Sequence, residues 1–442
     1  MLGVAALIGA TGLAGCSGGS GTPVLTWYIN PDNGTQAKLA EKCTSAAGGR
    51  YTIQTALLPR DSTGQREQLV RRLAAKDSGI DLMSLDLPYL AEFANADFVR
   101  PFTAEEQQDL TDGMLAGPLE SAKWDNQLYA VPFNTNTQLL WYHKSVAQKA
   151  GLTVDPSTQL TWQQVIEAAE QTGTTVQVQA KKYEGYTVLI NGLIASAGGA
   201  ILKNPEAGKD VTPSIGSEAG KAAANVLRTL AHSKAAPADL SNSDEGTTQA
   251  GFKDAKGGFM TNWPFVYTAE TTTLNDLKKQ LSEAKSDADK SSLQKQVDQQ
   301  QAVVDDFGYA RWPTVKEGEN SAPPLGGVNV AIGAFTKNPS FAVDAVKCIT
   351  SEQSQQEYML GEGLLATWPD VYNQQAIKDA FPMAALLRES VDSAAPRPIT
   401  PYYADVTAAI QNTWHPPGAV TEQTPERSAQ LIVDVLHDKR LI

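Results

Sequence analysis

The sequence has little positive charge and few metal-binding side chains. Its 442 residues include 36 lysines and arginines against 49 aspartates and glutamates, which gives a formal net charge of -13. A surface with this acidic surplus does not neutralise a phosphate backbone, so nucleic acid is not expected as a partner. The three cysteines form no CxxC pair, and the four histidines form no HExxH motif. The pattern therefore predicts no metal site.

Motifs of nucleotide-dependent enzymes are also missing. The chain has no Gly-x-Gly-x-x-Gly motif after a predicted strand and no phosphate-binding loop, and the nearest approach, residues 216–221, has the wrong spacing. Such motifs hold phosphates at fixed backbone N–H donors. Without them, we predict a protein that uses no cofactor.

The N-terminus carries the signature of an exported protein. Residues 2–14 are uncharged and mostly apolar, a run too short to cross a bilayer but typical of a signal peptide. The run ends in Leu13-Ala14-Gly15-Cys16, which resembles a bacterial lipobox. We therefore predict a signal peptide over 1–15, lipid on Cys16 and a flexible tether over 16–23. The lipid would anchor the protein to the outer face of the cytoplasmic membrane.

Two further cysteines, Cys43 and Cys348, remain after export. An oxidising compartment permits a disulfide between them. Their large separation in the sequence equally allows two separately buried thiols, so the sequence leaves both alternatives open.

The first part of the chain predicts an alternation of strands and helices. Strands are expected over 24–29, 51–58 and 80–85, with helices over 35–46 and 65–76 between them. This βαβαβ order favours a parallel sheet, whose ligand crevice lies beyond the carboxyl ends of the strands. Asn30, Asp32 and Asp86 occupy those ends.

At 442 residues the chain exceeds the size of one hydrophobic core, so two lobes are expected. The predicted fold is a two-lobed α/β structure in which each lobe is a mostly parallel sheet flanked by helices. The predicted boundaries are residues 24–134 for lobe 1, 135–306 for lobe 2, 307–335 for a return to lobe 1, and 336–442 for a helical C-terminal part of lobe 2.

One segment within lobe 2 has a different composition. Residues 271–306 contain no proline, glycine or aromatic residue, and apolar side chains recur at three- and four-residue spacings from Leu274 to Ala288. The phase breaks over residues 291–292 and then resumes. This pattern predicts a helical hairpin over about 271–306.

Several local motifs resemble those of the extracytoplasmic solute-binding proteins of carbohydrate ABC importers. The resemblance rests on residues 80–90 (IDLMSLDLPYL), 130–142 (AVPFNTNTQLLWY), 257–265 (GGFMTNWPF), 324–329 (PLGGVN) and 397–403 (RPITPYY). Within this family the chain is most similar to the trehalose-binding lipoproteins of mycobacterial trehalose-recycling importers. The resemblance implies a two-lobed periplasmic-binding-protein-like fold and a monomer that delivers a disaccharide, first of all trehalose, to importer permease subunits.

The resemblance also implies a set of ligand-binding residues. Hydroxyl groups of the sugar would bind to carboxylates, amides and an arginine, and an aromatic ring would stack on the sugar face. The implied set is Asn30, Asp32, Asp86, Asn134, Asn136, Glu184, Trp263, Phe265, Gly326, Gly327 and Arg397, where the two glycines let backbone approach the ligand.

Most of these residues have an alternative interpretation. Trp263 could fill a core, Asp86 could cap a helix, and Arg397 could form a surface ion pair. Asn30 and Asp32 could serve only as turn formers.

Two other functions also fit a cleft with carboxylates. One is a secreted glycoside hydrolase, because a pair of carboxylates can act as acid and base. The other is a carbohydrate-binding scaffold of the cell envelope. The lipobox and the crossings between lobes favour the binding protein.

Overall fold

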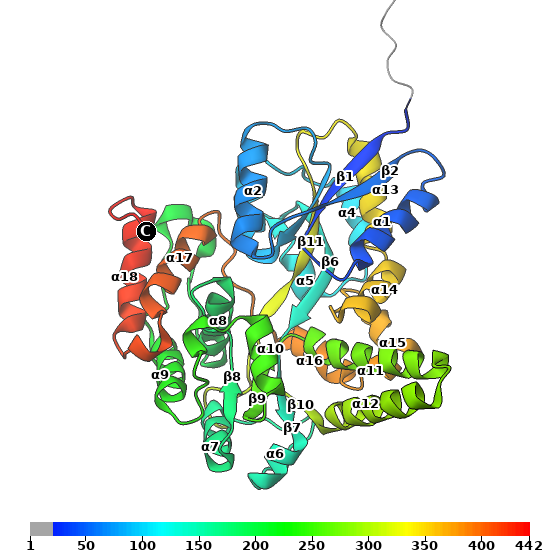
Figure 1. Cartoon of the computed structure of the whole chain (residues 1–442). Coiled ribbons are helices and arrows are strands. Elements are labelled where there is room, and N and C mark those ends of the chain that lie inside the picture. The colour runs from blue at the N-terminus through cyan, green and yellow to red at the C-terminus, as the bar shows by residue number, and fades with distance from the viewer. Residues whose placement is uncertain (1–20) are drawn as a thin grey trace, which may run out of the picture.

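The computed structural model describes residues 21–442, which fold into two lobes, each built on its own β-sheet (Figure 1). The sheet of the first lobe has the strand order β2-β1-β3-β11-β6. Its strands are β1 (Val24–Ile29), β2 (Thr52–Leu57), β3 (Leu82–Asp86), β6 (Ala130–Thr137) and β11 (Leu325–Ile332). The predicted signal peptide, Cys16 and most of the predicted tether lie outside the described residues.

The sheet of the second lobe has the order β10-β7-β9-β8. Its strands are β7 (Leu139–His143), β8 (Thr175–Gln177), β9 (Gly257–Asn262) and β10 (Phe307–Ala310), and a separate short ribbon consists of β4 (Lys123–Trp124) and β5 (Gln127–Leu128). A single residue, Gln138, separates β6 of the first sheet from β7 of the second. The chain therefore crosses between lobes almost without a loop.

The two-lobed α/β fold is confirmed, but the sheets are mixed rather than mostly parallel. In the first sheet, β1 runs parallel to β2 and β3, whereas β11 runs antiparallel to both β3 and β6. In the second sheet, β8 and β9 pair in parallel, and β7 pairs antiparallel with β9 and β10. The reason is that a strand which crosses over from the other lobe enters its sheet at the end nearest that lobe. It therefore runs antiparallel to its neighbours in the sheet.

Seven helices belong to the described part of the first lobe. They are α1 (Thr35–Ala46), α2 (Ser62–Ala74), α3 (Leu90–Asn95), α4 (Ala104–Thr111), α5 (Ala116–Glu120), α13 (Pro339–Ile349) and α14 (Glu352–Glu362). The predicted boundaries differ here, because residues from 336 were expected in lobe 2. Both α13 and α14 instead pack on α1, and a disulfide between Cys43 of α1 and Cys348 of α13 joins two of these helices covalently.

The second lobe contains most of the remaining helices. They are α6 (Lys144–Lys149), α7 (Trp162–Thr172), α8 (Glu184–Ser196), α9 (Glu218–His232), α10 (Glu245–Lys253), α11 (Phe265–Glu283), α12 (Asp287–Asp306), α17 (Tyr403–Trp414) and α18 (Thr424–Leu436). Helices α15 (Gln375–Ala380) and α16 (Ala384–Ser393) lie near the junction of the lobes (Figure 1). Short 3-10 helices are η1 (Leu87–Tyr89), η2 (Pro205–Asp210), η3 (Leu240–Asn242), η4 (Pro369–Asn373) and η5 (Pro417–Ala419). Within residues 21–442, none of the helices has both the length and the apolar character that a membrane span requires.

The predicted helical hairpin is present and projects from the second lobe (Figure 1). It begins at Phe265, earlier than predicted, because α11 starts directly after Trp263-Pro264. The turn lies at residues 284–286 rather than at the phase break, since Ser286 caps α12 by accepting a hydrogen bond from Asp289 N (3.1 Å). The hairpin brings the chain back to the edge of β7, so β10 joins the second sheet. The expectation that residues from 307 return to the first lobe is therefore wrong for β10.

Three hydrophobic cores hold these layers. One fills the first lobe, a second lies among α7, α8, α9 and the C-terminal helices, and a third packs the opposite face of the second sheet against α11 and α16. The third core contains Trp141 and Phe307 of the second sheet together with Leu87 and Met359 of the first lobe. The lobes therefore share a packed base on one side.

Candidate functional site

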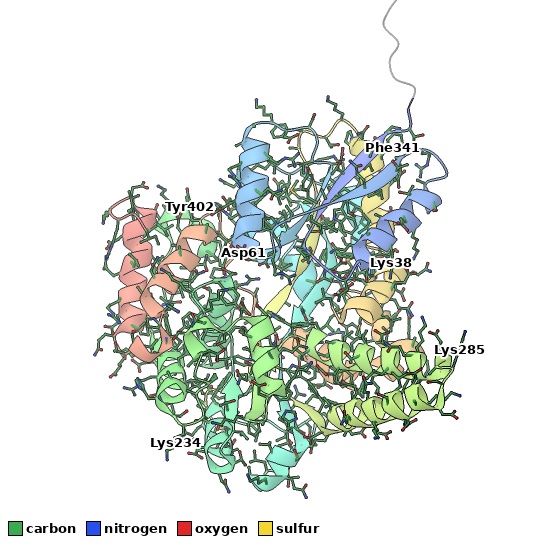
Figure 2. All side chains as sticks on the ribbon, viewed as in Figure 1. Lys38, Asp61, Lys234, Lys285, Phe341 and Tyr402 are labelled. Atoms are coloured by element: carbon green, nitrogen blue, oxygen red, sulfur yellow. A yellow bond between two sulfur atoms is a disulfide. The ribbon has the colours of Figure 1, made fainter. Side chains whose placement is uncertain are left out.

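A cleft of about 920 Å³ lies between the two lobes. From the first lobe it is lined by residues at the carboxyl ends of β1 and β3 and at the start of α2, where Figure 2 labels Asp61. From the second lobe it is lined by the starts of α8 and α10 and by the segment after β9. Its size falls within the roughly 300–1,000 Å³ of small-molecule sites.

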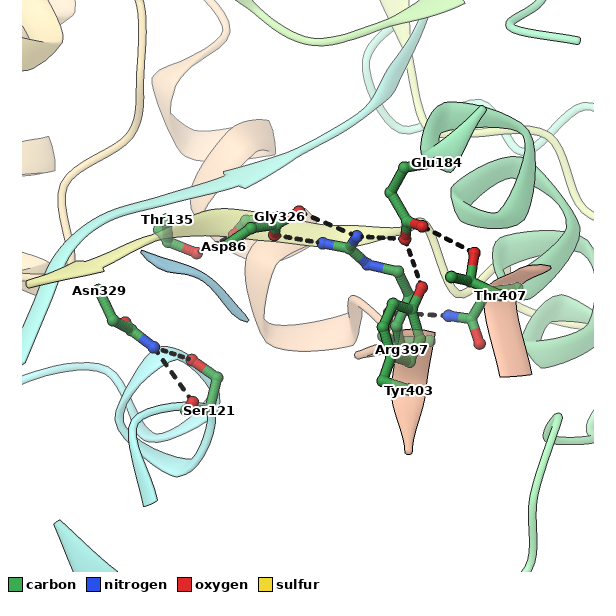
Figure 3. A network of polar contacts seen from close by, with 11 residues as sticks. Asp86, Ser121, Thr135, Glu184, Gly326, Asn329, Arg397, Tyr403 and Thr407 are labelled. Carbon is green, nitrogen blue, oxygen red and sulfur yellow. Dashed lines mark hydrogen bonds and ion pairs between the residues drawn. The ribbon is translucent and has the colours of Figure 1, made fainter. Parts of the chain in front are cut away.

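The floor of the cleft is an ion triad centred on Arg397 (Figure 3). Arg397 Nη2 donates to Asp86 Oδ1 (2.6 Å), and Nη1 donates to Glu184 Oε1 (2.6 Å) and Asp86 Oδ2 (3.2 Å). Asp86 ends β3 of the first lobe, and Glu184 begins α8 of the second. Asp86 precedes η1 without capping it, and Arg397 is only 6% exposed, so neither the helix cap nor the surface ion pair describes these residues.

Glu184 is held by further donors from α17. The hydroxyls of Tyr403 and Thr407 both donate to its carboxylate, the latter to Oε2 at 2.7 Å (Figure 3). Burial raises the pKa of the Glu184 carboxyl, and the nearby Asp86 carboxylate raises it further, whereas the Arg397 guanidinium and the hydroxyl donors lower it. Two carboxylates thus share one guanidinium, which leaves the floor one negative charge in excess when both are ionised.

An aromatic wall closes the second-lobe side. Trp263 and Phe265 both line the cleft, and Trp263 is half-buried rather than part of a core. Trp263 N donates to Asn262 Oδ1 (2.9 Å). Tyr183 is a third aromatic residue of this wall, and it was not predicted from the sequence.

Gly326 and Gly327 also line the cleft, but both make room for neighbouring parts of the protein. A Cβ atom at Gly326 would lie 2.8 Å from Trp263 Cη2, and one at Gly327 would collide with the Asn134 carbonyl oxygen. Gly327 has a φ of +134°, which side-chain-bearing residues rarely adopt. The glycines therefore make room for the indole and the adjoining strand, and the predicted approach of a ligand to their backbone stays a prediction.

Three asparagines reach the cleft as expected. Asn30, Asn134 and Asn136 are all among its lining residues. Asn134 is 2% exposed, and its Nδ2 has no hydrogen-bond partner within residues 21–442. Arg397 Nε is likewise buried without a partner in the described chain. Two donors that belong to cleft-lining residues are thus buried without a partner, which is costly unless a ligand or water accepts from them.

Asp32 does not line the cleft. Its carboxylate accepts hydrogen bonds from Gly34 N (2.9 Å) and Gln36 N (2.8 Å) at the start of α1. The turn-former alternative therefore describes Asp32, although its neighbour Asn30 lines the cleft.

Several further polar residues line the cleft that were not predicted from the sequence. They are Arg60, Asp61, Ser62, Thr63 and Gln65 from the first lobe and Lys181, Asp244, Glu245 and Gln249 from the second. The first group follows a predicted strand, so the same sheet-edge argument that found Asn30 would have found it. No local sequence pattern marks the second group as cleft residues, because only tertiary folding brings α10 to the cleft.

No group of three His, Cys, Asp or Glu side chains that could hold a metal ion occurs within residues 21–442. Two lobes around a polar cleft with an aromatic wall define a protein that encloses a small solute. The model of the bacterial extracellular solute-binding protein family matches residues 38–385, and the chain belongs to this family. It is therefore a binding protein and not an enzyme, which removes the hydrolase alternative.

Individual relatives agree with this assignment. A probable ABC transporter-binding protein of Deinococcus radiodurans is 25% identical over 358 residues, which cover 79% of this chain and 77% of that protein. Maltose-bound MalE3 of T. maritima has a TM-score of 0.75 at 23% identity, covering 94% of this chain and 100% of that one. The GacH receptor of Streptomyces glaucescens has a TM-score of 0.72 at 20% identity, covering 94% and 98%. The two structures establish the fold.

Proposed function

We propose that the protein is a lipid-anchored, extracytoplasmic sugar-binding protein that captures a disaccharide, first of all trehalose, between its lobes and delivers it to an ABC importer. The observation that carries this proposal is the pairing of an aromatic wall with unsatisfied buried donors. Trp263 offers a flat apolar face, and Asn134 Nδ2 and Arg397 Nε need acceptors. A sugar presents apolar C–H faces and oxygen acceptors together.

The charges of the cleft favour a neutral ligand. The lining contains five acidic side chains against three basic ones. Arg397 is already shared by Asp86 and Glu184, and Lys181 Nζ lies 3.3 Å from Asp244 Oδ2. An anionic ligand would meet this acidic surplus with most cations already paired, whereas hydroxyl groups can donate to carboxylates without adding charge.

Trehalose is the first candidate because of the motifs that resemble trehalose-binding lipoproteins. The structural relatives bind a wider range of compounds, including maltose, acarbose, tagatose and ribitol. All of these carry several hydroxyl groups. These relatives therefore support a ligand with several hydroxyl groups, and the motifs make trehalose the first candidate among such ligands.

Calorimetric titration of the purified protein tests the proposal. The panel should contain trehalose, maltose, sucrose, glucose and ribitol, with glycerophosphocholine as a zwitterionic comparison. We expect a disaccharide to bind with the highest affinity and to be recovered unchanged after incubation. Binding of glycerophosphocholine alone, or of no sugar, would refute the proposed ligand class.

The lipid anchor needs a separate experiment, because Cys16 lies outside the described residues. We expect full-length protein expressed in a bacterial host to fractionate with membranes and to carry a lipid mass on Cys16. Cys16→Ala should abolish the lipid mass. An unmodified Cys16 in the mature protein would contradict the anchor while leaving sugar binding untouched.

A further inference from the structure

We propose that Gln179 and Thr248 are positioning residues that hold Trp263 where it can stack on a sugar. They belong to a set of side chains joined by hydrogen bonds, which also contains Gln138 and Asn262 and which we call the buried polar network. Neither Gln179 nor Thr248 lines the cleft, so an effect of either one on the ligand must pass through other residues. The inference deepens the proposed function and rests on it only for the affinity measurements.

The crossing between the lobes and Trp263 lie at the same end of one strand pair. Strand β7 begins at Leu139, directly after Gln138, and β9 ends at Asn262, directly before Trp263. Leu139 pairs with Asn262 in the antiparallel register. Gln138 and Trp263 therefore leave the strand pair side by side, and Trp263 lines the cleft there.

One half of the buried polar network starts at the crossing. Gln138 Nε2 donates to Gln179 Oε1 (3.0 Å). Gln179 Nε2 donates in turn to Thr248 Oγ1 (3.2 Å) and to the Thr261 carbonyl oxygen (2.9 Å). Gln179 therefore connects the crossing to both α10 and β9, which pack against each other (Figure 1).

The other half of the network ends at Trp263. Asn262 Nδ2 donates to Thr248 Oγ1 (2.9 Å) and to the Glu245 carbonyl oxygen (3.0 Å), and Asn262 Oδ1 accepts from Trp263 N (2.9 Å). The Asn262 carbonyl oxygen also accepts from Trp141 Nε1 (2.8 Å). Thr248 is thus the junction of the network, because hydrogen bonds from both halves meet at its hydroxyl oxygen.

Burial of the network gives a physical reason for a positioning role. Gln179, Thr248 and Asn262 are 0% exposed and Gln138 is 1% exposed. Apolar side chains would fill such a core without the cost of removing amides from water. Hydrogen bonds are directional, so the polar side chains supply a fixed geometry that apolar packing does not. Stacking on a sugar depends on such a geometry, because it requires the ring to lie at a defined place and angle.

The first test uses the ligand-free protein and needs no sugar. Protein labelled with ¹⁵N-tryptophan gives a backbone amide resonance for Trp263, which is assigned by its loss in Trp263→Phe. We expect Gln179→Met and Thr248→Val each to shift this resonance, because the hydrogen bond from Trp263 N to Asn262 Oδ1 is the last one of the network. An unchanged resonance in either variant would overturn the inference.

Gln355→Met is the matched control. Gln355 is a buried glutamine of the first lobe, and its Nε2 donates to the Pro132 and Thr350 carbonyl oxygens (3.0 and 2.9 Å). It does not line the cleft. Gln355→Met should lower the urea midpoint as Gln179→Met does and leave the Trp263 resonance in place. An equal shift in the control would mean that any loss of a buried amide moves Trp263, which would also overturn the inference.

The second test measures the effect of the network on sugar binding. Trehalose affinity is determined by calorimetry for Gln179→Met, Thr248→Val, the double variant and Gln355→Met. We expect a loss of about fivefold in each single network variant and of less than about tenfold in the double variant, since residues that act through one another are not additive. Gln355→Met should bind within about twofold of the parent, because it lies outside the network.

Two results of the affinity measurement would contradict the positioning role. One is an affinity equal to that of the parent in both single variants, and the other is a loss in the double variant equal to the product of the two single losses. If the parent itself binds no sugar, the proposed function fails, while the Trp263 amide resonance still decides whether Gln179 and Thr248 position Trp263.

Discussion

Arg397 Nη1 lies 2.6 Å from Glu184 Oε1, and both side chains are less than one-tenth exposed. Because Asp86 occupies the other side of the same guanidinium, a single arginine compensates carboxylates from both lobes. Removing one member of a buried ion pair is far more costly than removing a surface pair, because the remaining charge is left without a partner.

We therefore expect Arg397→Met to lower the free energy of unfolding by about 3–5 kcal/mol. Arg311→Met, which breaks a surface pair with Glu389, should cost no more than about 1 kcal/mol. Urea unfolding at pH 7 measures both. Adding Asp86→Asn and Glu184→Gln to Arg397→Met should restore most of the loss, and a failure of this rescue would show that packing of the arginine matters more than its charge.

Trp263→Ala should abolish measurable trehalose binding while the protein stays folded, because the cleft would lose its main stacking surface. Trp368 provides the comparison. It is absent from the cleft lining, and its Nε1 donates to the Thr350 carbonyl oxygen (2.9 Å) within a packed region. Trp368→Ala should instead reduce stability by roughly 3 kcal/mol and leave trehalose affinity nearly unchanged. Calorimetry and urea unfolding of both variants check this, and the reverse result would move the stacking platform to Trp368.

Substitutions at the two cleft glycines should have separable effects. Gly326→Ala would push against the Trp263 ring and should lower trehalose affinity by about tenfold, an energetic cost of about 1.4 kcal/mol. Gly327→Ala should cost about 2 kcal/mol of stability or more, because a positive φ and a backbone collision coincide there.

Gly34→Ala is the control for these glycine variants. Gly34 has a φ of +99° but an open surrounding for a Cβ atom, so only the backbone strain should appear. Equal destabilisation by Gly34→Ala and Gly327→Ala would show that the collision at Gly327 relaxes at little cost.

The pH dependence of stability should report on Glu245. Its folded-state pKa is raised above the ordinary value of 4.5, so the folded protein binds the proton more tightly than the unfolded chain. Stability from this group is therefore complete below pH 4.5 and falls as the pH rises through the folded-state pKa. Glu245→Gln should remove this fall, so its stability relative to the parent should be higher at pH 7.5 than at pH 4. Urea unfolding at the two pH values measures the change, and a constant difference would contradict it.

Ligand binding should bring the lobes closer together. The crossings that can bend are Gln138, residues 311–324 and the segment around Arg397, while the shared third core holds the base. Small-angle scattering should show a smaller radius of gyration in saturating trehalose than without sugar. A control titration with Trp263→Ala should show no change, and compaction in that variant would point to an effect of the sugar on the solvent instead.

Part of the cleft was predictable from the sequence. Asn30 and Asp86 follow predicted strands, and the carboxyl ends of parallel strands lie at one edge of a sheet, so their place at a crevice follows from topology alone. The hairpin was also predictable, because its apolar residues repeat at helical spacing over a stretch without helix breakers. Asp32 shows the limit of this reasoning, since a carboxylate after a strand can equally cap the next helix.

The sequence by itself determined the local elements and the apolar and polar character of each segment, because these depend on neighbours within a few positions. Tertiary structure alone decided which distant residues meet. Arg397 joins Asp86 across 311 positions and Glu184 across 213, and β10 pairs with β7 only after the hairpin has brought it back. The physical reason is that burial, charge pairing and strand order depend on how all the layers pack together.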